Sequence, residues 1–498
     1  MEIGTVISLT IYFLVMLGIG LYAFKTTSQD SSGYLLGGRQ LGPAVTALSA
    51  GASDMSGWMV MGLPGAMYLT GFSNIWIGLG LIAGAYVNYL IVAPRLRAYT
   101  EIANDSITLP EFFENRFEDK SRLLRIVSSI VIIVFFTVYT SSGVVGGGKL
   151  FESSFGLSYE LGLYVTAGVV VIYTLFGGFL AVSMTDFVQG CIMFIALVLV
   201  PAVILFDFGG YAAISDTVTN LSPSHLDFVS GTTVLGIISS IAWGLGYFGQ
   251  PHIIVRFMAI RSVKDIKTAR RIGMTWMIVA LVGAMATGFF GYAYVAKTGI
   301  EMGDPETIFI VLSQVLFHPL IGGFLLAAIL AAIMSTVSSQ LLVTSSSLTE
   351  DVYKAFINKE ASEKQLVFMG RICVVLVALV AIAMAHNRDS SILNIVSNAW
   401  AGFGAAFGPL VVLGLYWKRM TFGGALAGIV VGASTVLIWI YAPFTIGGES
   451  PGDVIYEIVP GFTLSTIAIV LVSLAGNQPS HSMQELFDVM VRRVKEES

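Results

Sequence analysis

Long apolar segments recur along the chain and constrain its fold more than any other feature. Runs such as 165–180, 192–206 and 278–295 approach the ~20 apolar residues that cross a bilayer. A chain in lipid must satisfy its own backbone hydrogen bonds, so its spanning segments are helices or strands of a closed barrel. Barrel strands would appear as ~10-residue stretches of alternating polarity, which this sequence does not contain. The sequence therefore predicts an all-α membrane protein.

Composition agrees with a surface that faces lipid. Only 11% of the 498 residues are charged and 55% are hydrophobic, whereas about a quarter of the residues of a soluble protein are charged. The two cysteines, Cys191 and Cys373, lie in apolar segments. We expect them to pack as small hydrophobic residues rather than to form a disulfide or bind a metal.

Hydropathy predicts thirteen membrane spans. Their expected bounds are 4–24, 45–70, 75–94, 124–147, 160–180, 187–207, 232–255, 273–296, 318–347, 368–385, 394–416, 424–442 and 457–475. Because this count is odd, the termini lie on opposite sides of the membrane. With the N-terminus outside, all but three of the 26 Lys and Arg residues fall on the cytoplasmic side, the exceptions being Lys149, Lys297 and Arg388. This asymmetry predicts an outside N-terminus and a cytoplasmic C-terminus.

Polar and flexible residues interrupt the second span. Two glycines, two serines and Asp54 lie between Ala50 and Trp58, and such residues disfavour helix or compete for its backbone hydrogen bonds. An unwound segment at membrane depth is tolerated where it lines a cavity or is buried in protein, and its carbonyl groups can coordinate a cation. Charged groups within spans are functional candidates by default, here Asp54 and Asp186, which lies near the cytoplasmic end of the sixth span. A structural kink with a satisfied aspartate is the alternative.

The seventh span is interrupted in the same way, by three glycines and a proline between Ala242 and Pro251. The two broken spans lie five spans apart and so run in opposite directions, which indicates two inverted repeats whose broken helices meet at a central transport site. Gly244 to Gly249 also fits the dinucleotide pattern G-x-G-x-x-G, but it lacks the preceding β-strand which that motif requires. The expected regions are a first helix with a cytoplasmic loop (1–44), helices 2–6 as the first repeat (45–207), helices 7–11 as the second (208–416), and helices 12–13 with a cytoplasmic tail (417–498).

The ninth span presents hydroxyl groups on one face. Ala332, Ser335 and Thr336 follow i, i+3, i+4 spacing and share that face. Two hydroxyls and a carbonyl opposite unwound carbonyls would form a neutral oxygen cage suited to a monovalent cation, whereas Mg²⁺ or Ca²⁺ would need more carboxylates. Serine and threonine also join membrane helices by hydrogen bonds. From the spacing alone, sodium binding and helix packing both stay open.

Four stretches of the sequence are long and distinctive: 39–58, 243–252, 331–340 and 399–409. Together they closely resemble the sodium/solute symporter family, and within it the bacterial sodium/proline symporters. The resemblance covers nearly the whole chain and weakens in the loop 207–230 and in the C-terminal tail. It implies thirteen helices, a leucine-transporter-type core of two inverted five-helix repeats, and Na⁺-coupled uptake of L-proline across the plasma membrane by alternating access.

The resemblance also implies roles for individual residues. The implied sodium ligands are the backbone carbonyls of Ala52 and Met55, completed by Ala332, Ser335 and Thr336. Asp54 matches the acid that the family needs for sodium affinity, either beside the ion or as a ligand. The residues that match proline-binding positions are Ser56, Gly57, Tyr139, Trp243, Tyr247 and Pro251, and Trp58 is a further candidate for the apolar wall of the pocket. Arg39 and Asp186 match charged residues that matter for transport on the cytoplasmic side.

The expected partners are L-proline, Na⁺ as the coupling ion, and the lipid bilayer. We expect no other cofactor, no nucleic acid, no obligate protein partner and no enzyme activity, since the sequence contains no nucleophile–base pair, metal-ligand cluster or nucleotide-binding loop. The nearest alternative is a symporter of the same family for another amino acid or an osmolyte. A channel, a membrane sensor and a membrane enzyme are weaker alternatives.

Overall fold

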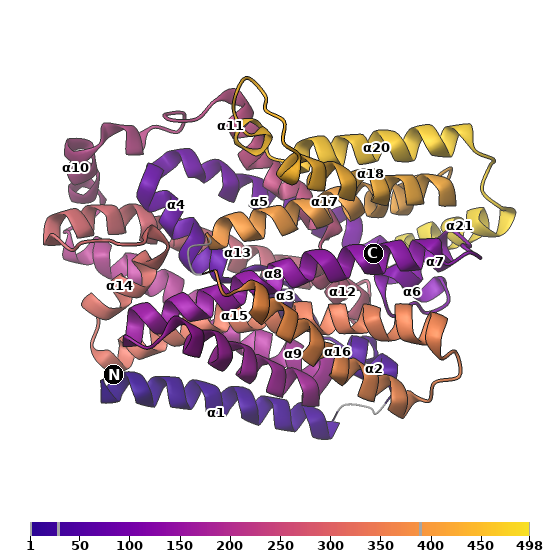
Figure 1. Cartoon of the computed structure of the whole chain (residues 1–498), viewed down its shortest axis with the longest axis horizontal. Coiled ribbons are helices and arrows are strands. Elements are labelled where there is room, and N and C mark those ends of the chain that lie inside the picture. Colours follow the sequence, from indigo (N-terminus) through magenta and orange to yellow (C-terminus); the bar gives the residue numbers. More distant parts are fainter. Residues whose placement is uncertain (1, 27–29, 388–390, 498) are drawn as a thin grey trace.

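The computed structural model describes residues 2–26, 30–387 and 391–497, and these residues form helices joined by loops (Figure 1). Two isolated β-bridges, Leu41 with Ile260 and Ile446 with Glu449, are the nearest approach to a sheet in this part of the chain. Arg388, expected on the outer side, is not among the described residues. The all-α class predicted from the sequence is confirmed.

The elements follow one another along the chain, with short 3₁₀ or π segments labelled η. The first half contains α1 (Ile3–Thr26), α2 (Ser31–Leu36), η1 (Gly37–Arg39), α3 (Pro43–Asp54), η2 (Trp58–Gly62), α4 (Leu63–Thr70), η3 (Gly71–Asn74), α5 (Ile75–Val87), η4 (Asn88–Val92), α6 (Ala93–Ile102), α7 (Leu109–Arg116), α8 (Leu123–Phe155), α9 (Tyr159–Asp207), α10 (Tyr211–Leu221) and η5 (Pro223–Leu226). The second half contains α11 (Val234–Ala242), η6 (Trp243–Gly249), α12 (Pro251–Ala259), α13 (Asp265–Thr298), η7 (Pro305–Thr307), α14 (Ile308–Val315), α15 (Pro319–Ser346), η8 (Ser347–Ile357), α16 (Glu363–Met384), α17 (Ile392–Tyr416), α18 (Phe422–Tyr441), α19 (Pro451–Val454), α20 (Ile458–Ala475) and α21 (His481–Glu497).

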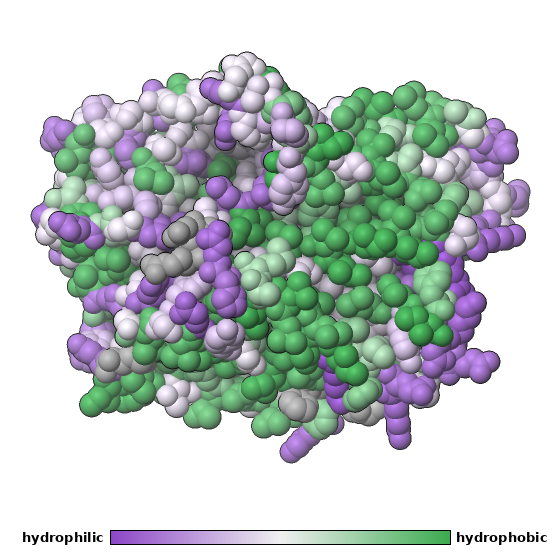
Figure 2. Space-filling model, in the orientation of Figure 1, coloured by the Kyte–Doolittle hydropathy of each residue, from purple (hydrophilic) through white to green (hydrophobic). Residues whose placement is uncertain are grey.

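Ten helical segments of the described residues are long and apolar enough to cross a membrane. Three further apolar helices are shorter, namely Tyr159–Leu175, Val234–Gly249 and Pro305–Val315. Figure 2 shows a broad apolar band between two ends where hydrophilic side chains gather. This arrangement confirms a multi-pass membrane protein, while the count of thirteen spans stays a prediction.

The expected loop between the fifth and sixth spans, at 181–186, is helical instead. Both spans belong to α9, which changes direction at Gly178, where φ is 56° and ψ is −152°. Glycine adopts such a conformation readily because it has no Cβ, and a Cβ here would lie 2.6 Å from the Tyr34 ring. The boundary was misplaced because a single glycine, rather than a polar loop, makes the bend.

Both predicted interruptions are present. α3 ends at Asp54, and Met55 has the non-helical angles φ −80° and ψ 77° before the chain continues into η2. In the second break, η6 ends at Gly249, Gln250 is extended at φ −80° and ψ 106°, and α12 begins at Pro251. Proline disfavours the helical conformation in the residue before it and lacks an N–H of its own. Local composition therefore explains where each helix breaks.

The helix α15 forms the centre of the molecule and positions the site. Its side chains are buried almost throughout from Gly322 to Ser346, and it packs against α1, α3, α8, α9 and α16. Figure 1 shows α1 along one flank and α18 beside α20 along the other. The amphipathic α21 lies at one end and packs on α6.

Candidate ion and substrate site

The carbonyl group of Ala52 is released from α3 where that helix ends. In an uninterrupted helix it would accept a hydrogen bond from the N–H of Ser56, but this N–H bonds to the carbonyl of Asp54 at 2.9 Å. The Ala52 oxygen instead accepts hydrogen bonds from Ser335 Oγ at 2.6 Å and from Thr336 Oγ1 at 3.4 Å. The break thus turns a backbone acceptor toward α15.

The same two hydroxyls also reach the carbonyl of Ala332, at 3.1 Å from Ser335 and 3.3 Å from Thr336. Oxygen atoms of Ala52, Ala332, Ser335 and Thr336 therefore converge between α3 and α15, and all four residues are buried. We call this group the α3–α15 cage. It consists of neutral oxygens, the donor set expected for a monovalent cation rather than for Mg²⁺ or Ca²⁺.

Met55, the remaining predicted ligand, lies at the break itself. Its side chain is fully buried, and its N–H still bonds to the carbonyl of Gly51 at 2.9 Å. It adjoins the cage along the chain, and its role as a ligand stays a prediction.

Asp54 turns to the other broken helix rather than to the cage. Its Oδ2 accepts a hydrogen bond from the hydroxyl of Tyr247 at 2.5 Å, and its backbone carbonyl accepts from Trp58 Nε1 at 3.0 Å and from Tyr139 at 3.5 Å. Its second oxygen, Oδ1, is buried with no hydrogen-bond partner among the described residues. The carboxylate therefore ties the two breaks together, and its part in sodium binding stays a prediction.

Aromatic side chains surround Asp54 at the point where the two helix breaks meet. We call this group, which consists of Trp58, Tyr139, Trp243, Tyr247 and Trp400, the aromatic junction. Trp58 lies 6.3 Å from Trp243 between ring centroids, and Tyr139 and Tyr247 reach Asp54 as described, so four of the predicted substrate residues come together. Trp400 was not singled out from the sequence, yet it lies 5.1 Å from the Tyr247 ring and donates its Nε1–H to the carbonyl of Trp243 at 2.7 Å. The Trp400 ring packs directly against Gly246, where a Cβ would lie 1.9 Å from the ring nitrogen. The glycine at position 246 was therefore the feature of the sequence that could have indicated a large side chain packed there.

The other predicted substrate residues are placed differently. Ser56 follows Met55 in the break and Gly57 starts the next helical segment, where a Cβ on Gly57 would lie 3.5 Å from Ile333 of α15. Pro251 lies apart from the aromatic group, in a small cavity of about 20 Å³ that Thr108 and Ser346 also line. Ser56 and Gly57 are therefore beside the junction, whereas Pro251 is set away from it.

The two predicted transport-associated charges hold different parts of the molecule together. Arg39 pairs with Asp105 at 2.8 Å and donates to the carbonyls of Ser106 and Met258, both at 2.7 Å. Burial lowers the pKa of Arg39 below its usual value, although Asp105 acts in the opposite direction. Arg39 thus joins η1 to the loop after α6 and to α12.

Asp186 lies in a fully buried polar cluster. Its Oδ2 accepts from Ser49 Oγ at 2.8 Å and from Arg256 at 3.1 Å, and Arg256 also donates to Ser339 Oγ at 2.6 Å. These groups come from α9, α3, α12 and α15. Arg256 was expected in a cytoplasmic segment just past the seventh span, but its side chain is fully buried, because α12 continues to Ala259.

A polar cavity of about 820 Å³ lies against α4. Lys149 of α8 and Glu306 of η7 are among the residues that line it. Lys149 pairs with Glu306 at 2.9 Å and with Asp304 at 3.0 Å. Glu306 also accepts from Ser391 Oγ at 3.0 Å and from the N–H of Ile392 at 3.2 Å, at the start of α17. Sequence reasoning missed this cluster, because its members lie in connecting segments and at helix ends.

Comparison with known proteins identifies the family. The family model described as "Sodium:solute symporter family" matches residues 34–432. The osmoregulated proline transporter OpuE of Bacillus subtilis is 58% identical, over 99% of each chain. The high-affinity proline transporter PutP of the same organism is 59% identical, over 95% of this chain and 98% of its own. Sodium/proline symporter 2 of Staphylococcus saprophyticus is 55% identical, over 99% of this chain and 97% of its own.

Solved structures agree in fold. A substrate-bound, outward-open Na⁺-coupled sialic acid symporter superposes with a TM-score of 0.81 at 20% identity, over 96% of this chain and 99% of its own. Mhp1, a nucleobase-cation-symport-1 family transporter in a closed conformation, gives 0.56 at 14% identity, over 91% and 98%. Both have the leucine-transporter type of fold, as the resemblance implied for this chain. With a family model spanning most of the sequence and near full-length relatives above 50% identity, the chain belongs to the sodium:solute symporter family.

Proposed function

We propose that the chain is a sodium-coupled symporter that takes up L-proline across the cell membrane by alternating access. The observation that carries the proposal is the pairing of the α3–α15 cage with the aromatic junction, on the two sides of one helix break. The names of its near full-length relatives, proline transporters and sodium/proline symporters, support the same substrate and ion.

Sodium would couple to the substrate through the geometry of the break. An ion held by Ala52 of α3 and by Ser335 and Thr336 of α15 would fix the end of α3 against α15. The substrate residues Ser56 and Gly57 follow directly in the chain, so the ion would favour the conformation that binds proline. By linkage each ligand then raises the affinity for the other equally. An inside-negative potential adds ~2.3 kcal/mol per charge per 100 mV to the driving force.

Proline would be recognised as a zwitterion with a flat apolar ring. The helical segment that follows the first break starts beside the aromatic residues, and the N-terminus of a helix favours a carboxylate through its N–H groups and its dipole. The Trp58, Trp243 and Tyr247 rings offer an apolar wall. Asp54, bonded to Tyr247, links this wall to the ion-binding side. No covalent step is required of any residue.

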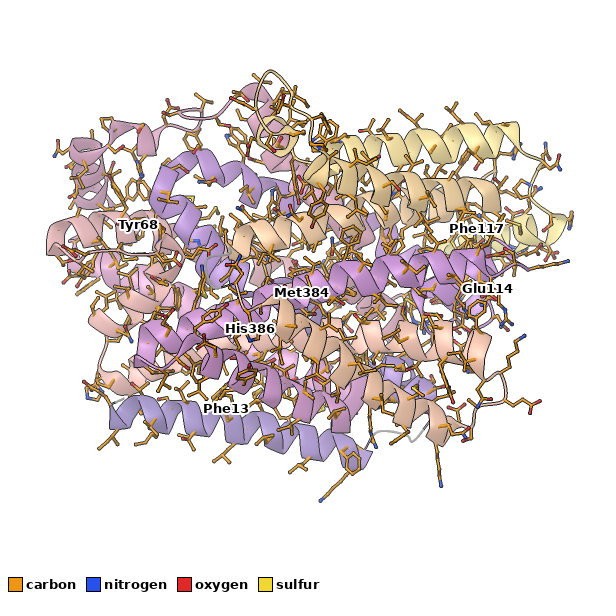
Figure 3. The ribbon with its side chains drawn as sticks, in the orientation of Figure 1. Phe13, Tyr68, Glu114, Phe117, Met384 and His386 are labelled. Atoms are coloured by element: carbon orange, nitrogen blue, oxygen red, sulfur yellow. The ribbon has the colours of Figure 1, made fainter. Side chains whose placement is uncertain are left out.

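We further propose the arrangement of the chain in the membrane: thirteen spans, inverted repeats at 45–207 and 208–416, and an outside N-terminus. Corresponding breaks in the first helices of the two regions support the repeats. Figure 3 places Glu114 and Phe117 at one end of the molecule and Tyr68 toward the other. The end with Glu114 would face the cytoplasm, where the basic residues of the loops gather.

The test is uptake of radiolabelled proline by the purified protein in proteoliposomes. Uptake above equilibrium is expected with an inward Na⁺ gradient and none with an equal K⁺ gradient. Unlabelled amino acids and osmolytes added in excess separate proline from the alternative solutes of the same family. The proposal would be refuted by proline uptake that does not depend on the Na⁺ gradient. It would also be refuted by another solute that inhibits uptake of labelled proline far more strongly than unlabelled proline does.

A further inference from the structure

One aromatic residue from outside the expected repeats packs against the aromatic junction. Tyr456 lies between α19 and α20, in the region 417–498, where the sequence predicts no part of the site. Its ring stacks on that of Trp243, with the ring centroids 5.3 Å apart and the planes at 26° to each other. Both side chains are only 7% exposed. Tyr456 therefore covers one of the rings of the proposed substrate wall.

Two hydrogen bonds fix Tyr456 between the elements that carry the junction. Its hydroxyl donates to the carbonyl of Ser397 at 2.7 Å, on α17 and three residues before Trp400. Its backbone N–H donates to Ser239 Oγ at 3.0 Å, on α11 and four residues before Trp243. The same residue thus joins the helix that leads into the second break to the helix that carries Trp400.

The segment that carries Tyr456 is also held from its other side. Ile455 is extended, at φ −148° and ψ 131°, and its carbonyl accepts a hydrogen bond from Trp439 Nε1 of α18 at 3.0 Å. The carbonyl of Tyr456 accepts from the N–H of Val459 at 2.9 Å, where α20 begins. Because its backbone and its hydroxyl are both bonded, the Tyr456 ring is a fixed surface for Trp243.

Trp243 needs such a support because of where it lies. It is the first residue of η6, a 3₁₀ segment, and 3₁₀ hydrogen bonds have poorer geometry than those of an α-helix. The Trp400 ring also lies nearly parallel to it, at 28° and 6.5 Å between centroids. Across the junction, Trp58 lies 6.3 Å from Trp243, so the orientation of Trp243 decides the spacing of these two rings.

We propose that Tyr456 is a positioning residue, which holds Trp243 in the orientation that the substrate wall requires and so limits the size of ring that the site accepts. Tyr456 acts through Trp243 and needs no contact with the substrate. Binding sites depend on such supports, since a residue that contacts the ligand is only as precise as the packing behind it. The inference rests on the proposed function, because it takes Trp243 as part of the proline site.

The test compares Tyr456→Leu, which removes the ring, with Tyr456→Phe, which keeps it. Loss of an aromatic pair changes an equilibrium constant roughly 2- to 10-fold. The KM for proline uptake in proteoliposomes should rise by this factor in Tyr456→Leu, with little change in the maximal rate, and should return most of the way in Tyr456→Phe. Pipecolic acid, the six-membered homologue of proline, should inhibit uptake more strongly relative to unlabelled proline in Tyr456→Leu than in the wild type.

Tyr441→Leu is the matched control for this comparison. It makes the same substitution at the end of the neighbouring α18, where Tyr441 is 73% exposed. The KM for proline and the inhibition by pipecolic acid should both stay at their wild-type values. An equal shift in Tyr441→Leu and Tyr456→Leu would overturn the proposal.

A double variant separates positioning from a general loss of stability. Equilibrium binding of labelled proline gives its Kd without requiring transport. Because Tyr456 acts through Trp243, adding Tyr456→Leu to Trp243→Ala should raise this Kd no further than Trp243→Ala does alone. Independent effects that multiply in the double variant would overturn the proposal, as would an unchanged KM and unchanged inhibition by pipecolic acid in a folded Tyr456→Leu.

Tyr456→Met is the second variant should Tyr456→Leu fail to fold, and the same rise in KM is expected, because methionine fills space without a ring. Failure of this inference is distinct from failure of the proposed function. If the proposed function is wrong, the wild type itself does not accumulate proline with a Na⁺ gradient. If only the inference is wrong, wild-type uptake is intact and the Tyr456 variants share its KM.

Discussion

Replacing Thr336 with alanine removes one hydroxyl from the α3–α15 cage and little else. Thr336 Oγ1 makes only long hydrogen bonds, at 3.4 Å to Ala52 and 3.3 Å to Ala332. The Ala52 carbonyl keeps its 2.6 Å hydrogen bond from Ser335, so the substitution leaves no buried acceptor without a hydrogen bond. A neutral hydrogen bond contributes about 1 kcal/mol, and we expect a loss of stability no larger than this.

The expected effect on sodium is larger. A polar group that contacts a charged partner contributes about 1.5–3 kcal/mol, and each 1.4 kcal/mol is a tenfold change in an equilibrium constant. The Na⁺ concentration for half-maximal proline uptake should therefore rise roughly 10- to 100-fold. Uptake at saturating Na⁺ should recover much of the wild-type rate, since the aromatic junction is untouched.

The assay is initial-rate uptake in proteoliposomes across a series of Na⁺ concentrations, with thermal unfolding measured on the same preparations. Thr344→Ala is the matched control, because this hydroxyl on the same helix bonds only to the carbonyl of Gln340 at 2.7 Å. An unchanged sodium dependence in Thr336→Ala, or an equal shift in Thr344→Ala, would refute the assignment of the cage.

Other substitutions test neighbouring parts of the argument. Gly246→Ala should abolish proline uptake, because its Cβ would overlap the Trp400 ring at 1.9 Å; Gly168→Ala, with no atom within 4 Å of its Cβ, should leave uptake unchanged, and equal activity of the two variants would contradict this packing. Asp186→Asn should lower the free energy of unfolding by about 3–5 kcal/mol, because it leaves the buried Arg256 uncompensated, and adding Arg256→Gln should restore part of it; a melting temperature that stays at the wild-type value would show that the Asp186–Arg256 pair does not stabilise the fold. Asp54→Asn should lose sodium-dependent uptake, whereas Tyr247→Phe, which removes one donor to that carboxylate, should keep part of it; normal sodium-driven uptake in Asp54→Asn would remove Asp54 from the mechanism.

The positions of the helix breaks could be predicted because their causes are local. Glycine, serine and proline weaken the helix at the residues where they stand, so composition alone predicted breaks within Ala52–Gly57 and Gly244–Pro251, and the helices break inside these ranges, at Met55 and Gln250. The shared face of Ala332, Ser335 and Thr336 followed from helical periodicity. Boundaries were less accurate where one residue decided them, as at Gly178 in α9.

The sequence by itself determined that the chain is a helical membrane protein, where its helices break, and which residues share a face. Only the tertiary structure decided which partner each face meets. It paired Asp54 with Tyr247, 193 positions away, placed Arg256 against Asp186, and seated Trp400 over Gly246. Periodicity along one helix defines the direction of a side chain, but its neighbour belongs to another helix, and that choice depends on how all the helices pack together.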